Sequence, residues 1–189
     1  MTCRVEFSRL RLLCWGLSVA LSLFLHRTAA ADVKLPAIFA SHMVLQQGQP
    51  DRVWGWAEPG EEVTVSIAGQ TKTAKAGEDG KWLVTLDPLK VGGPHTLAIK
   101  GKNEIKLDDV LVGEVWLCSG QSNMQWALGQ AVDGVLESLA ADFPQIRLIS
   151  VPQVGTQEPQ SDFKGQWELC TPETAKQFSA VGFFFGRQL

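Results

Sequence analysis

Between residues 35 and 110, hydrophobic and polar residues alternate in short segments separated by turn residues. The alternation is clearest at 51–56, 62–67, 81–86 and 95–99, and the turns at 58–60, 78–80 and 92–94 each contain glycine. A period of two places alternate side chains on opposite faces of a strand. Regular strands with such turns and no helical period predict an antiparallel β-sandwich over residues 32–110.

The pattern changes at Gly113. Residues 115–118 form a continuous apolar run, which predicts a strand buried on both faces, and the polar loop 119–123 follows it. Apolar residues at three- and four-residue spacing then predict a helix that ends near Pro144. A second strand is predicted at 146–151 and a further helix at 178–187. This order predicts the start of a parallel α/β sheet over residues 111–189, with the loop at the ligand-binding edge.

Residues 1–31 have the pattern of a secretory signal peptide. Arg4, Arg9 and Arg11 precede the apolar run 12–25, and three alanines end at Ala31. A membrane anchor is the alternative, but the run is shorter than the roughly 20 residues that span a bilayer as a helix. We therefore expect export to the periplasm or the cell exterior, with cleavage before Asp32 and no membrane span left afterwards.

Removing this segment takes four of the 17 basic and one of the 20 acidic residues, which leaves 13 and 19 and a net charge of about −6. Such a chain, without a Lys/Arg run, is not expected to bind nucleic acid or anionic lipid. Cys118 and Cys170 could pair in an oxidising compartment, but Cys118 lies in the predicted apolar strand and we expect two free thiols. The remaining histidines and cysteines lack metal-ligand spacing, and no glycine loop suits a phosphate, so we expect no metal and no nucleotide cofactor.

Ser122 follows the predicted buried strand and directly precedes the predicted helix. A loop in this place can expose a serine hydroxyl, and the N–H groups that begin a helix can stabilise an oxyanion. A serine at this point is also an ordinary helix N-cap. The flanking residues do not match the G-x-S-x-G elbow, because Met124 stands where the second glycine would be.

The segment 113–124, which reads GEVWLCSGQSNM, resembles the nucleophile block of the sialate O-acetylesterase family, a branch of the SGNH hydrolases. Residues 35–39, 42–46 and 178–182 are similar to further parts of the same family. The resemblance implies a β-sandwich followed by a flavodoxin-like hydrolase domain, in which Ser122 attacks an acetyl ester on a sugar or glycan. It also implies that the Ser122 N–H contributes to the oxyanion hole. The residues expected to shape the oxyanion and substrate pocket are Gly120, Gln121, Asn123 and Trp126.

Enzymes of this family activate the serine with a histidine in an Asp-x-x-His block late in the chain. No histidine follows Ser122, and neither His42 nor His95 has an aspartate three residues before it. We therefore expect little or no esterase activity from residues 32–189 alone, because loss of the base costs several orders of magnitude in rate. Two other hypotheses remain open: a non-catalytic β-sandwich that recognises glycan or protein, with Ser122 as a helix cap, and an inactive fragment that leaves residues such as 183–185 uncovered.

Trp54 and Trp56 are two residues apart in a predicted strand and therefore share one of its faces. Such a pair could form a platform on which a sugar stacks. Tryptophan pairs in sandwich strands are more often part of the core, and we expect that role here.

Overall fold

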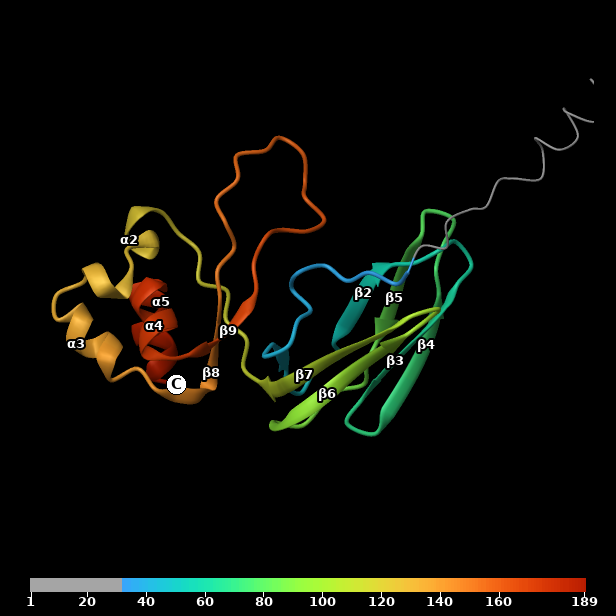
Figure 1. Ribbon diagram of the computed structural model, residues 1–189, viewed down its shortest axis with the longest axis horizontal. Coiled ribbons are helices and arrows are strands. Elements are labelled where there is room, and N and C mark those ends of the chain that lie inside the picture. Colours follow the sequence, from blue (N-terminus) through green and yellow to red (C-terminus); the bar gives the residue numbers. More distant parts are fainter. Residues whose placement is uncertain (1–31) are drawn as a thin grey trace, which may run out of the picture. The chain divides into compact units, whose positions relative to one another are not determined.

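The computed structural model describes residues 32–189. The expected signal peptide, residues 1–31, lies outside the described residues and stays a prediction. The first part of the described chain consists of strands and turns (Figure 1). In chain order the strands are β1 (Val44–Gln46), β2 (Arg52–Trp56), β3 (Glu62–Ile67), β4 (Gln70–Lys75), β5 (Lys81–Thr85), β6 (Gly92–Lys100) and β7 (Glu104–Gly113).

These strands form two sheets. The larger has the order β1-β7-β6-β3-β4, and the smaller pairs β2 with β5. All pairs are antiparallel except β1 with β7, which run parallel. The expectation of a wholly antiparallel arrangement is therefore wrong at this edge. Alternation along a strand determines which residues share a face, but it carries no information on the direction of the neighbouring strand.

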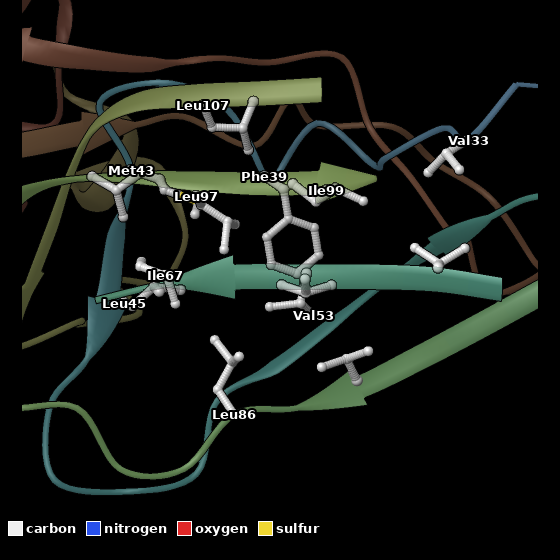
Figure 2. Close-up of a cluster of buried hydrophobic side chains, with 14 of the residues drawn as sticks. Val33, Phe39, Met43, Leu45, Val53, Ile67, Leu86, Leu97, Ile99 and Leu107 are labelled. Carbon is white, nitrogen blue, oxygen red and sulfur yellow. The ribbon is translucent and has the colours of Figure 1, made fainter. Parts of the chain in front are cut away.

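One hydrophobic cluster joins the two sheets (Figure 2). Val63 and Val65 of β3 and Leu97 and Ile99 of β6 are fully buried in it, and Val53 of β2 packs with them. These are the inward positions that the alternation predicts. Burying each such side chain contributes about 1.5–3 kcal/mol relative to leaving it in water, so this cluster is the main source of stability in this part of the chain.

Trp54 and Trp56 lie on the other face of β2. Val53 and Gly55 face the core, whereas Trp54 is 39% exposed. The ring of Trp54 meets Phe39 edge-on, with centroids 4.6 Å apart. The expectation that the two tryptophans belong to the core is therefore wrong, because the alternation left open which of the two faces of β2 turns inward.

The second part of the described chain contains short helices and one pair of strands. Its elements are α2 (Ser122–Gln125), the 3₁₀ turn η1 (Leu128–Gln130), α3 (Gly134–Leu139), β8 (Phe143–Ile149), β9 (Trp167–Cys170), α4 (Pro172–Gln177) and α5 (Ala180–Arg187). The expected strand at 146–151 and the expected helix at 178–187 correspond to β8 and α5. No helix in the described part of the chain is long and apolar enough to cross a bilayer.

The single helix expected between Met124 and Pro144 is wrong, because the chain forms three short helical turns instead. Ala127 and Ala131 have extended backbones, and Asp133 has a φ of +56°. A Cβ at Gly134 would lie 1.8 Å from the carbonyl oxygen of Leu128, so the turn packs too tightly for any other residue. Separate turns can place apolar residues at the same three- and four-residue spacing as one continuous helix.

The strand expected at 115–118 is also absent from the described residues. Val115, Trp116 and Leu117 are exposed, Leu117 to 90%. β8 pairs with β9 in antiparallel fashion, so the expected parallel α/β sheet is not formed within residues 32–189. A strand buried on both faces needs paired neighbours and cover on both sides, and an apolar run does not specify whether they are present.

Candidate functional site

The segment 113–124 is held at its beginning by two glutamines, Gln46 at the end of β1 and Gln47 directly after it. The side-chain oxygen of Gln46 accepts a hydrogen bond from the Val115 N–H at 2.9 Å. The side-chain amides of Gln46 and Gln47 donate to the Glu114 carboxylate at 3.0 and 2.7 Å. These two donors lower the pKa of Glu114 because they stabilise its ionised form. Glu114 thus anchors the segment to β1.

The end of the same segment is held by the start of α5. The Ala180 N–H donates to the Trp126 carbonyl at 2.8 Å, and the Ser179 hydroxyl contacts the Met124 sulfur at 3.2 Å. Ser179 also caps α5, because its hydroxyl oxygen accepts from the Gly182 N–H at 3.2 Å. Two of the sequence blocks that carry the family resemblance, 113–124 and 178–182, are therefore in contact.

Ser122 is the first residue of α2, and the N-cap position belongs to Gln121. The side chain of Ser122 is exposed, and its hydroxyl has no hydrogen-bond partner among residues 32–189. The alternative that Ser122 is a helix N-cap is therefore wrong. The N–H groups of Ser122 and Asn123 lie in the first turn of α2, where a helix has no internal acceptors for them. The arrangement offers an uncommitted hydroxyl beside N–H donors that can face an anionic oxygen.

The other expected site residues share this exposed surface but do not enclose a pocket. Gly120, Gln121 and Asn123 are exposed, and Trp126 is 54% exposed. A Cβ at Gly120 would lie 3.1 Å from the Met124 Cβ, so glycine lets the loop pack closely on Met124. We find that these four residues lie beside Ser122 along one short loop and turn.

A cavity of about 370 Å³ is lined in part by residues close to Ser122 in sequence, but Ser122 itself does not line it. Its lining includes Trp116, Cys118, Phe178 and Phe185, together with residues of β7 and β8. The rings of Trp116 and Phe185 meet edge-on, with centroids 5.1 Å apart. None of the expected site residues lines this cavity.

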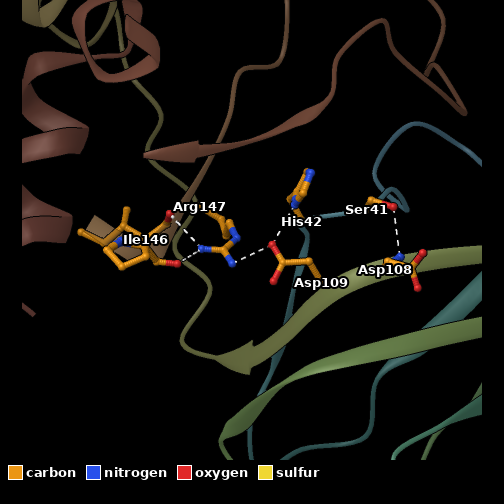
Figure 3. A network of polar contacts seen from close by, with 7 residues as sticks. Ser41, His42, Asp108, Asp109, Ile146 and Arg147 are labelled. Atoms are coloured by element: carbon orange, nitrogen blue, oxygen red, sulfur yellow. Dashed lines mark hydrogen bonds and ion pairs between the residues drawn. The ribbon is translucent and has the colours of Figure 1, made fainter. Parts of the chain in front are cut away.

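Sequence reasoning missed a charged network between the β strands and β8 (Figure 3). Asp109 Oδ2 lies 2.7 Å from His42 Nδ1 and 2.9 Å from an Arg147 guanidinium nitrogen. The hydrogen bond with His42, and after it the charge of Arg147, lower the pKa of Asp109. The Arg147 side chain is only 4% exposed. Because His42 and Asp109 are far apart in sequence, no local motif could have revealed the pair.

His42 therefore has an aspartate partner, although not one three residues before it. No hydrogen bond or ion pair joins His42, Asp109 or Arg147 to the 119–124 loop in the described part of the chain. Instead the network connects β7 to β8. We interpret it as a structural link between the strands and the region that carries Ser122.

Cys118 and Cys170 are both unpaired, which confirms the expectation of two free thiols. Burial raises the pKa of the Cys170 thiol. Within residues 32–189, no three His, Cys, Asp or Glu side chains come together where they could hold a metal ion.

Comparison with known proteins places these features in context. No protein-family model matches the chain. The chain is 34% identical over 196 residues to the sialate O-acetylesterases of Homo sapiens and Pongo abelii, in alignments that cover 92% of this chain and 37% of each relative. It therefore spans little more than a third of the length of these curated relatives. A crystal structure of a carbohydrate acetylesterase from Xanthomonas citri matches with a TM-score of 0.81 and 42% identity, over 84% of this chain and 37% of that chain.

Proposed function

Because the chain belongs to the sialate O-acetylesterase family, we propose that it is part of an exported carbohydrate O-acetylesterase whose nucleophile is Ser122. The observation that carries the proposal is the state of Ser122. Its hydroxyl is exposed and caps no helix, and it lies in a segment fixed at both ends by hydrogen bonds. A nucleophile needs this combination of a free hydroxyl and a fixed backbone.

In the proposed reaction, Ser122 Oγ forms a bond to the acetyl carbon and its proton passes to a base. The carbonyl oxygen becomes an oxyanion, which the Ser122 N–H helps to stabilise. Collapse of this intermediate breaks the bond to the sugar oxygen, which leaves as a hydroxyl after taking a proton. Water then hydrolyses the acetyl-serine and releases acetate.

The base for this reaction is not found beside Ser122. A serine hydroxyl near its ordinary pKa is a weak nucleophile, and no histidine contacts Ser122 by a hydrogen bond within residues 32–189. We propose that the histidine and its aspartate come from outside this part of the protein. Residues 32–189 alone are then expected to show little or no serine-dependent activity.

We also propose two domains, a β-sandwich over residues 32–110 and part of a flavodoxin-like hydrolase domain over residues 111–189. The presence of two separate hydrophobic clusters supports this division. A parallel sheet in the second domain requires further strands beside residues 115–118, which are exposed here. The proposed substrate is an acetyl ester on sialic acid or another acetylated sugar, and export rests on the pattern of residues 1–31.

Comparison of two serine variants tests the proposal on the product of the whole gene, purified from its own cells. Ser122→Ala should lower acetate release from an O-acetylated sialic acid by on the order of a thousandfold or more. Ser119→Ala is the matched control, because Ser119 is an exposed serine of the same loop, and its rate should stay within a few-fold of the wild type. Equal rates for the wild type and Ser122→Ala would contradict the proposal.

The alternative of a binding protein without catalysis takes a different form in this structure. In the sequence-based hypothesis Ser122 serves as a helix cap, but Gln121 holds that position. The exposed Trp54 nevertheless favours a binding role for the β strands themselves.

A further inference from the structure

The outer face of the β2–β5 sheet, which is the face turned away from the core, carries an aromatic and apolar centre between cationic ends. The register places Trp54 opposite Leu83, Arg52 opposite Thr85, and Trp56 opposite Lys81. Lys34 is bridged to Trp56 from the other side of β2. Directly opposed residues in antiparallel strands point to the same face, so these side chains form one continuous surface.

The centre of this surface is unusually apolar for its part of the molecule. Among residues 32–113, the exposed large hydrophobic residues are Trp54, Leu83 and Val91, and the first two are direct cross-strand neighbours. Trp54 is 39% exposed and Leu83 50%. The buried Phe39 holds the Trp54 ring in place by its edge-on contact. The result is a fixed aromatic ring that leaves part of its surface open to solvent.

A cationic side chain lies at each end of this surface. Arg52 lies at one end, and Lys34 and Lys81 lie at the other. Arg52 and Lys34 have no carboxylate partner within the described residues, while Lys81 lies 3.4 Å from Asp79 in a pair that is largely exposed. Cations around an exposed aromatic ring stand out in a chain that carries about −6 after residue 31. This surface therefore attracts an anionic ligand that also has an apolar face.

We propose that the outer face of the β2–β5 sheet binds an acidic sugar of a glycan, at a site separate from Ser122. The apolar C–H face of the sugar ring packs on Trp54 and Leu83. The sugar carboxylate pairs with Arg52, whose planar guanidinium suits two parallel hydrogen bonds to a carboxylate. A neutral sugar would satisfy only one of the two features.

Two oligosaccharides that differ by one acidic sugar unit provide the test. The full chain is titrated by calorimetry with sialyllactose and with lactose, its neutral counterpart. Sialyllactose should bind at least about tenfold more tightly than lactose. Trp54→Ala should weaken sialyllactose binding by about tenfold or more, because the stacking surface is lost. Arg52→Gln should weaken it and reduce its dependence on salt.

Matched controls separate this site from general effects. Trp116→Ala removes an exposed tryptophan elsewhere, and Lys75→Gln removes an exposed charge of β4; both should bind sialyllactose like the wild type. Calorimetric binding does not depend on ester hydrolysis, so a failure of the esterase proposal leaves this result distinct. Equal affinity for the two sugars, equal loss in Trp54→Ala and Trp116→Ala, or no binding by the folded wild-type chain would overturn the proposal.

Discussion

The strands at 32–113, here called the β region, and the C-terminal region at 114–189 bury their apolar residues to very different extents. Of the large hydrophobic residues exposed among residues 32–189, 3 lie in the β region and 14 in the C-terminal region. The β region supplies almost all of a cluster that spans two sheets, whereas the cluster confined to the C-terminal region has only seven buried residues. The β region therefore has a closed core, whereas the C-terminal region leaves much of its apolar surface exposed. The candidate nucleophile lies in the C-terminal region.

Hydrogen bonds and an ion pair connect the two regions. Gln46 fixes the start of the 113–118 segment, and Asp109 pairs with the buried Arg147. The Trp167 indole N–H donates to the Ile38 carbonyl at 2.8 Å. Contacts with the β region therefore hold the C-terminal region in place, in addition to the packing of its own core.

The largest effect is expected from a charge placed in the closed core. Leu97→Asp puts a carboxylate at a fully buried position of β6 and should lower the free energy of unfolding by more than about 4 kcal/mol. The matched variant Leu136→Asp, at a position that is 67% exposed in α3, should change it by less than about 0.5 kcal/mol. Urea denaturation followed by circular dichroism measures both. Similar losses in the two variants would show that the regions do not differ in this way.

A smaller effect is expected from the network between the regions. Asp109→Asn removes the charge that pairs with the buried Arg147 and should cost about 1–3 kcal/mol at neutral pH. Asn tolerates the positive φ of this position, so the backbone can stay unchanged. Faster amide hydrogen exchange should follow in β8, with little change in β3. The control Asp87→Asn, which breaks an exposed pair with Lys72, should have at most a small effect.

The pH dependence of this difference follows from the pKa of Asp109. Its pKa in the folded chain lies below the ordinary value of 3.8, so the carboxylate contributes stability that is fully present above that value. The contribution is lost as the pH falls through the lowered pKa. The gap between the wild type and Asp109→Asn should therefore shrink in acid below about pH 4. A gap that stays constant into strong acid would contradict this role.

The sequence predicted the inward positions of the β region well, because alternation is a local property and one face of each strand is buried. It could not predict the parallel direction of β1 beside β7, or that Trp54 turns outward, since both depend on the partner strand. In the C-terminal region, the apolar run 115–118 and the spaced residues after Met124 suggested regular elements that need packing neighbours to form. A position of Ser122 close to the start of a helix was predicted, although the structure places Ser122 inside α2 and not in the loop before it. The link between His42, Asp109 and Arg147 was not predicted, because only the tertiary fold brings them together.

Identification of the residue that carries the acetyl group is the most direct test of the role proposed for Ser122. The whole gene product is mixed with an activated acetyl ester, quenched in acid within one turnover and digested for peptide mass spectrometry. An added acetyl group on the peptide that contains Ser122, absent in Ser122→Ala and retained in Ser119→Ala, is the expected result. An acetyl group on another residue, or turnover of the ester that persists unchanged in Ser122→Ala, would contradict the proposed nucleophile.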